Sequence, residues 1–170
     1  MRLISLIYMW YVGHPKSIKP DNRYTFKYIV FRISTRMGTL LIVRHGETDW
    51  NAQGRIQGHT DIGLSEKGAE QARSLRQRLA DRQIDVAYSS DLKRTSETAE
   101  LALGDRDLVL NQTPRLREYH KGVFEGMTLE EIKLQYPAEY PKYLEKDLSY
   151  APEGGETTRD VSIRMASIFE

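Results

Sequence analysis

The sequence contains no cysteine among its 170 residues. This absence excludes disulfide bonds, thiolate nucleophiles and zinc sites built on cysteine. A chain without cysteine suits a reducing compartment, and on this ground we predict a cytoplasmic location.

The chain also has little net charge and no long hydrophobic run. Its 25 basic and 24 acidic residues leave a formal net charge of +1, which gives no overall field that would recruit nucleic acid or an anionic membrane. The apolar run at residues 3–12 is too short to cross a bilayer, and no small-residue cleavage site follows it. No Gly-x-Gly-x-x-Gly follows a predicted strand, and no nucleic-acid-binding motif is present. We therefore expect no nucleic-acid partner and no membrane partner, and any recognition of an anion must be local.

Residues 1–36 differ in composition from the rest, being rich in aromatic and β-branched residues and ending in a basic stretch. Met37 is followed directly by an apolar run that predicts a buried strand. We therefore divide the chain into an N-terminal extension, residues 1–36, and one domain, residues 37–170. That Met37 is the natural start, with residues 1–36 an extension or a misassigned translation, is a hypothesis. N-terminal mass spectrometry of the native protein that found Met1 would refute it.

The remaining chain alternates predicted strands and helices. Short apolar runs predict strands at 40–43, 85–88 and 108–110, and helical spacing of apolar residues predicts helices at 66–82, 92–103, 128–136 and 157–170. Ser65 is expected to cap the first of these helices, residues 89–91 the second, and Thr128 with Glu131 to form a capping box on the third. Residues 137–147, aromatic and charged, are expected to form a cap or lid. The alternation predicts an α/β fold, a three-layer α/β/α sandwich with a mostly parallel sheet, whose ligands bind at the carboxyl ends of the strands.

Chemically useful side chains begin where the first of these strands ends. Arg44, His45 and Gly46 follow it directly, which delivers a cation and an imidazole to the sheet edge beside a glycine that permits close backbone approach. Such a site suits a phosphate group. These three residues alone do not separate a functional histidine from a structural one.

The neighbouring residues resolve this ambiguity. Residues 41–51, Leu-Ile-Val-Arg-His-Gly-Glu-Thr-Asp-Trp-Asn, resemble the signature of the histidine phosphatase superfamily, which includes the cofactor-dependent phosphoglycerate mutases. Further motifs follow in the family's order: Gln57-Gly58, Leu64 to Gly68, Ser89 to Thr95, Leu116-Arg117-Glu118 and Gly122 to Gly126. The resemblance covers about residues 39–170 and implies a phosphoglycerate mutase-like fold.

Phosphoryl transfer needs a positioned nucleophile, clustered cations and a proton for the leaving oxygen. A neutral nitrogen of His45 can attack phosphorus, and the resemblance implies a covalent phosphohistidine. Arg44 and Arg94 are expected to bind the transferred oxygens, because the planar guanidinium donates paired hydrogen bonds and keeps its charge. Arg94 also lies in the first turn of a predicted helix, whose amide end favours anions. The expected chemistry requires neither a metal nor a cofactor.

The resemblance assigns the remaining roles. It implies that Glu118 protonates the leaving alcohol, which requires burial to keep this carboxyl partly protonated near neutrality. It also implies that Asn51 donates a hydrogen bond to the phosphoryl group and that Gln57, with the backbone of Gly58, meets the substrate.

One part of the family pattern has no counterpart in this sequence. The family completes its pocket with a second histidine near the C-terminus, and none of the four histidines, His14, His45, His59 and His120, stands in that order. His59 is expected at the surface and His120 at the rim of the pocket. We expect a C-terminally truncated domain whose sheet lacks a central strand, leaving apolar surface unpaired. Loss of one phosphate donor would slow catalysis on the order of a hundredfold or more, so activity of this chain is in question.

The leading functional prediction is a phosphatase that hydrolyses a small-molecule phosphomonoester through phosphohistidine. The segment from Glu118 to Thr128 and the following cap resemble the shorter phosphatase branch, which includes broad-specificity and α-ribazole phosphatases. Two alternatives stay open: a phosphoglycerate mutase, and a non-catalytic fragment that only binds phosphate. The sequence names neither the substrate nor the oligomeric state.

Overall fold

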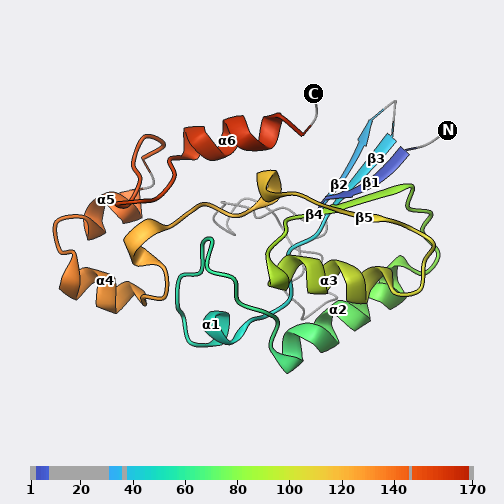
Figure 1. The fold of residues 1–170 in the computed structure, drawn as a ribbon, viewed down its shortest axis with the longest axis horizontal. Coiled ribbons are helices and arrows are strands. Elements are labelled where there is room, and N and C mark those ends of the chain that lie inside the picture. The colour runs from blue at the N-terminus through green and yellow to red at the C-terminus, as the bar shows by residue number, and fades with distance from the viewer. Residues whose placement is uncertain (1–2, 8–30, 36–37, 146, 169–170) are drawn as a thin grey trace.

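The computed structural model describes residues 3–7, 31–35, 38–145 and 147–168. Within this part a five-stranded sheet has the order β2-β3-β1-β4-β5 (Figure 1). The strands are β1 (Leu3–Ile7), β2 (Phe31–Thr35), β3 (Gly38–Ile42), β4 (Val86–Ser89) and β5 (Leu110–Gln112). Strand β1 runs parallel to β3 and β4, and β4 runs parallel to β5, whereas β2 is antiparallel to β3. The predicted α/β fold with a mostly parallel sheet is confirmed.

Strand β1 precedes Met37 in the sequence but lies in the middle of the sheet. Its residue Leu6 is in register with Leu41 of β3 on one side and with Ala87 of β4 on the other. The expectation that the sheet lacks a central strand is therefore wrong for the described sheet, because β1 supplies backbone partners to both neighbours. The division of the chain at residue 36 and the start at Met37 stay predictions.

The helices lie beside this sheet and along the loops that leave it (Figure 1). They are α1 (Asp49–Ala52), α2 (Glu66–Leu79), α3 (Lys93–Leu103), α4 (Leu129–Gln135), α5 (Tyr140–Glu145) and α6 (Thr158–Ala166), with 3-10 turns η2 (Pro114–Leu116) and η3 (Gly122–Phe124). The predicted caps of two helices are confirmed: the Ser65 hydroxyl accepts from the Gly68 amide at 3.1 Å, and Thr128 forms a capping box with Glu131. No helix in the described part is long and apolar enough to cross a membrane.

The predicted cap of α3 is wrong in detail. The helix begins at Lys93 with Leu92 as its N-cap, whose side chain makes no capping hydrogen bond, and the Lys93 amide donates to the Asp61 carboxylate at 2.7 Å. The Ser90 hydroxyl instead accepts from the Leu92 amide at 3.3 Å and lies 2.5 Å from the hydroxyl of Thr95. The serine therefore stabilises the turn between β4 and α3 rather than the helix amides themselves.

Helices α2 and α3 pack together beside the strands, and their buried faces form the core (Figure 1). The core consists of Leu41, Val43, Leu75, Leu79, Ile84, Ala87, Ala99, Ala102 and Leu103.

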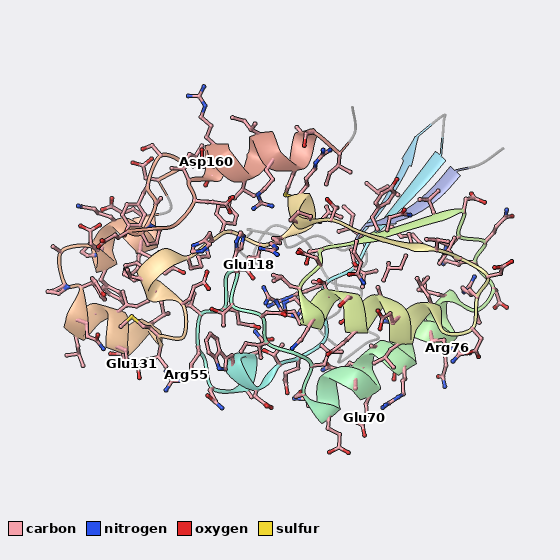
Figure 2. The ribbon with its side chains drawn as sticks, in the orientation of Figure 1. Arg55, Glu70, Arg76, Glu118, Glu131 and Asp160 are labelled. Atoms are coloured by element: carbon pink, nitrogen blue, oxygen red, sulfur yellow. The ribbon has the colours of Figure 1, made fainter. Side chains whose placement is uncertain are left out.

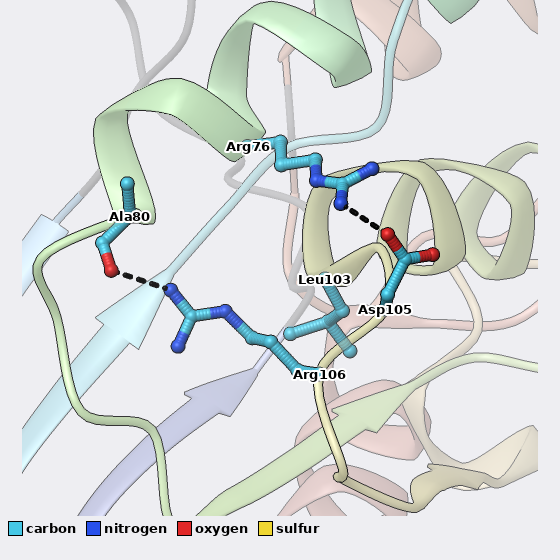
Figure 3. A pocket seen from close by; sticks show the side chains of 5 residues that line it. All are labelled: Arg76, Ala80, Leu103, Asp105 and Arg106. Carbon is cyan, nitrogen blue, oxygen red and sulfur yellow. Dashed lines mark hydrogen bonds and ion pairs between the residues drawn. The ribbon is translucent and has the colours of Figure 1, made fainter.

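A pocket of about 400 Å³ lies at the C-terminal ends of both helices (Figure 3) and is lined by Arg76, Ala80, Leu103, Asp105 and Arg106. The Arg106 guanidinium there donates to the Ala80 carbonyl at 3.2 Å and so provides a hydrogen-bond donor to the C-cap residue of α2. This pocket lies at the opposite end of α3 from Arg94.

Helices α4 and α5 lie far from the sheet, at the left of Figure 1. They pack on Phe124, whose ring makes edge contacts with Tyr136 and Tyr143 at centroid distances of 5.3 Å each. This buried phenylalanine holds α4 and α5 next to the loop that carries Glu118.

Candidate active site

His45 is delivered to the sheet edge because β3 ends at Ile42 and the chain continues through Val43 and Arg44. Its side chain is only 8% exposed. Its Nδ1 lies 2.7 Å from the Gly46 carbonyl oxygen. A carbonyl oxygen can only accept a hydrogen bond, so Nδ1 carries the proton and Nε2 carries the free lone pair. This buried Nε2 has no hydrogen-bond partner among the described residues.

The surroundings keep the His45 imidazole neutral. Burial, assisted by the positive charges of Arg94 and Arg44, lowers its pKa to about 3, although the bond to Gly46 opposes the shift. A neutral imidazole with an unshared lone pair on Nε2 is the nucleophilic form.

The loop after His45 is held by two glycines and a threonine. The Gly46 amide donates to the Thr98 hydroxyl of α3 at 3.0 Å. A Cβ on Gly46 would lie 2.5 Å from the Gly68 carbonyl oxygen, and a Cβ on Gly68 would lie 2.0 Å from the Glu47 carbonyl oxygen. Close approach of the loop to the start of α2 therefore requires glycine at both positions.

Arg94 lies in the first turn of α3 and is 1% exposed. Its guanidinium donates to the Gly58 carbonyl at 2.7 Å and to the Thr60 carbonyl at 3.0 Å, and its Nη2 lies 3.5 Å from a carboxylate oxygen of Glu118. Its Nε is buried without a partner in the described part of the chain. Arg44, in contrast, is exposed. Its positive charge acts to lower the pKa of both His45 and Glu118.

Glu118 follows η2 on an irregular loop, near the centre of the molecule in Figure 2. Its side chain is 9% exposed. Burial raises the pKa of its carboxyl to about 7, although the charges of Arg94, Lys121 and Arg44 act in the opposite direction. A carboxyl with this pKa is partly protonated near neutrality, which a proton donor requires.

Asn51 and Gln57 are brought together by the buried hydroxyl of Thr48. This hydroxyl lies 3.1 Å from Oδ1 of Asn51 and 3.0 Å from Oε1 of Gln57, and it accepts from the Asn51 amide in the capping box of α1. Because both side-chain oxygens point at Thr48, each carboxamide turns its NH₂ group away from this contact.

Glu125 holds the loop between Gln57 and Thr60. Its carboxylate accepts from the amides of His59 and Thr60 at 2.7 Å each and from the Lys121 amide at 3.0 Å. Burial would raise the pKa of Glu125, but these hydrogen bonds and that of the Thr60 hydroxyl lower it overall. Since the carbonyls of the same loop bind Arg94, Glu125 indirectly fixes that guanidinium.

The expected surface position of His59 is wrong. Its side chain is 19% exposed, and its Nε2 donates to the Glu118 carbonyl at 2.9 Å. Its ring makes an edge contact with His120 at a centroid distance of 4.6 Å. The loop fold around Glu125 turns His59 inward, which the sequence pattern does not reveal. The rim position expected of His120 stays a prediction.

Five further residues hold the site in place without taking part in its chemistry, a role that the sequence patterns do not predict. They are Thr48, Thr98, Glu125, Glu156 and Arg164. Thr48 and Glu125 lie within motifs already noted, but the motifs assign them no role. The contacts of Thr98, Glu156 and Arg164 with the site span 36 to 52 residues, separations at which local patterns carry no information. No cluster of three or more histidine, aspartate or glutamate side chains able to hold a metal ion occurs in the described part.

Residues 40–170 match the Histidine phosphatase superfamily (branch 1). The chain is 37% identical over 134 residues to phosphoserine phosphatase 1 of Hydrogenobacter thermophilus, covering 79% of this chain and 64% of that protein. It is 42% identical over 130 residues to a glucosyl-3-phosphoglycerate phosphatase of Mycolicibacterium vanbaalenii, covering 76% and 57%. The structure resembles the α-ribazole phosphatase of Shigella flexneri with a TM-score of 0.70 and 31% identity, over 74% of this chain and 62% of that one.

Phosphoglycerate mutases also occur among the similar proteins. The chain spans 57 to 64% of the length of the two curated phosphatases above. The match to the family extends over most of the chain and includes every residue of the candidate site. The chain therefore belongs to the histidine phosphatase superfamily.

Proposed function

We propose that this chain is a phosphatase that hydrolyses a small-molecule phosphomonoester through a phosphohistidine on His45. The observation that carries the proposal is the state of the His45 ring. The ring is neutral, and its Nδ1 donates a hydrogen bond to the Gly46 carbonyl. Its Nε2 is buried and has no hydrogen-bond partner in the described structure. The phosphatase names of several relatives support hydrolysis as the reaction.

In the first step Nε2 of His45 attacks phosphorus, so that an N–P bond forms as the ester P–O bond breaks. Arg44 and Arg94 stabilise the negative charge on the transferred oxygens, and Asn51 donates a further hydrogen bond. The Glu118 carboxyl gives its proton to the leaving oxygen, which departs as an alcohol. Gln57 and the Gly58 backbone contact the substrate.

In the second step water attacks the phosphohistidine. The N–P bond breaks, and the Glu118 carboxylate takes a proton from the water, which restores the acid for the next cycle. One group with a pKa of about 7 can serve in both directions, because neither protonation state is strongly favoured near neutrality.

Phosphoenzyme trapping tests the proposal. The purified chain and its His45→Ala variant are incubated with a labelled phosphomonoester, quenched in base and examined for acid-labile, base-stable label on protein. Label on the parent alone, with release of inorganic phosphate, is the expected result. Phosphate binding by a folded parent without any label would favour the non-catalytic alternative instead.

A phosphoglycerate mutase is the second candidate, since mutases occur among the relatives. Incubation with 2,3-bisphosphoglycerate and a monophosphoglycerate separates the two activities. A mutase interconverts the phosphoglycerates after priming, whereas the proposed phosphatase releases inorganic phosphate. The cytoplasmic location and the absence of a nucleic-acid partner stay predictions.

A further inference from the structure

The segment that carries Glu118 has no regular secondary structure of its own. It follows η2, and residues 117–121 lie in an irregular loop. A proton donor must be held within hydrogen-bond reach of the leaving oxygen, and a loop alone does not provide such precision. The position of Glu118 must therefore be set by contacts from other elements.

Arg164 of α6 supplies the first set of contacts. Its Nη1 donates to the carbonyls of Arg115 and Arg117 at 2.9 Å each, and its Nη2 donates to the Glu118 carbonyl at 3.1 Å. One planar guanidinium therefore binds the backbone of η2 and of the loop up to Glu118 itself. A lysine at this place could not reach these carbonyls together, because its ammonium is a single point of charge.

Glu156 supplies the second set. Arg164 holds its carboxylate with two parallel hydrogen bonds, from Nε at 2.9 Å and from Nη2 at 2.8 Å. The same carboxylate accepts from the His120 amide at 2.9 Å, and the Glu156 amide donates to the His120 carbonyl at 2.9 Å. Arg164 thus binds the chain up to Glu118, while Glu156 binds it two residues beyond.

The two residues are themselves well anchored. Thr157 and Asp160 form a capping box that begins α6 directly after Glu156, and Val161 of α6 is buried. The side chains of Arg164 and Glu156 are 19% and 21% exposed, so their ion pair is largely shielded from solvent. His59, whose Nε2 donates to the Glu118 carbonyl, lies 3.6 Å from the Glu156 carboxylate and packs on the same backbone.

We propose that the Arg164–Glu156 ion pair is a positioning device that holds the Glu118 carboxyl at the leaving oxygen. The inference rests on the proposed function and adds two positioning residues to it. Neither residue touches the substrate in this proposal, and both act through the backbone on either side of Glu118.

The first test compares leaving groups in the full-length chain. A substrate with an acidic phenol as its leaving group needs no proton, whereas an alkyl phosphate does. We expect Arg164→Gln to lower kcat/KM for an alkyl phosphate by about tenfold to a hundredfold and that for dinitrophenyl phosphate by only about twofold. Glu156→Gln keeps an acceptor for the His120 amide, so a smaller loss in the same direction is expected.

The matched control is Arg76→Gln, which breaks the exposed Arg76–Asp105 pair at the far end of α3. It should leave both substrates within about twofold of the parent, as is typical of exposed ion pairs. Equal losses on both substrates in Arg164→Gln, at an unchanged unfolding midpoint, would overturn the inference and leave Arg164 a purely structural residue.

The second test does not depend on turnover. Carboxyl carbon NMR follows the titration of Glu118 in the parent and in Arg164→Gln, with Glu118→Gln used to assign the signal. Burial raises the Glu118 pKa to about 7 against Arg94, Lys121 and Arg44, with Glu125 adding to the rise. Once the loop is released, water reaches the carboxyl, and the pKa should fall toward its ordinary value.

An unchanged Glu118 titration in the variant would contradict the inference even if the parent had no activity. Absence of His45 label in the parent would instead contradict the proposed function alone. The two failures are therefore distinguishable.

Discussion

At the scale of single residues, the site combines two groups whose pKa values are displaced in opposite directions. Burial lowers the pKa of His45 to about 3 and raises that of Glu118 to about 7. In both cases burial favours the neutral form, which is the attacking form of an imidazole and the donating form of a carboxyl. One physical cause therefore prepares both the nucleophile and the acid.

These two values predict a bell-shaped pH dependence of kcat/KM for an alkyl phosphate. The rate should rise as His45 loses its proton through pH about 3, and fall as Glu118 loses its proton through pH about 7. Steady-state hydrolysis between about pH 2 and about pH 9 measures both limbs.

Glu118→Gln is the control for this assignment. It should remove the limb near neutrality and lower the rate by about a hundredfold or more. A limb that persists in this variant would show that another group controls the descent.

At the scale of elements, the loop after β3 and the start of α2 can approach each other closely because glycine has no side chain. Gly68 lies inside α2, where alanine would ordinarily stabilise a helix by about 1 kcal/mol relative to glycine. Here a Cβ would meet backbone at 2.0 Å, and backbone cannot rotate away as a side chain can. Tertiary packing therefore reverses the local preference.

Gly68→Ala should consequently lower the free energy of unfolding by about 1 to 3 kcal/mol and displace the loop that carries His45. Urea denaturation measures the first effect, and the rate of His45 phosphorylation measures the second. Ser74→Ala, on the exposed face of the same helix, should change the free energy of unfolding by no more than about 0.5 kcal/mol. Equal stability of the two variants would show that the close approach to Glu47 does not exist in solution.

At the scale of the whole molecule, residues on both sides of Met37 contribute to one sheet. Strand β1 lies between β3 and β4, and β2 pairs with β3 from Phe31 to Thr35. The backbone hydrogen bonds of β1 thus connect the strand that leads to His45 with the strand that leads to α3 and Arg94.

A chain that begins at Met37 would lack both of these strands. We expect it to unfold at a lower urea concentration than the 1–170 chain and to bind more of a hydrophobic dye, because β3 and β4 lose the strand between them. Equal midpoints and equal m-values would show that β1 adds nothing to stability. That result would favour the hypothesis that residues 1–36 are an extension.

The sequence by itself determined the family and the α/β alternation, and it predicted the seven residues of the candidate site. These features are local: a short apolar strand followed by Arg44 and His45, a helix that begins near Arg94, and capping residues such as Ser65 and Thr128. Only the tertiary structure decided that β1 lies in the centre of the sheet, that His59 turns inward, and that Arg164 and Glu156 hold the Glu118 loop. These contacts join segments far apart in the chain, and their energy depends on burial and geometry that no local spacing records.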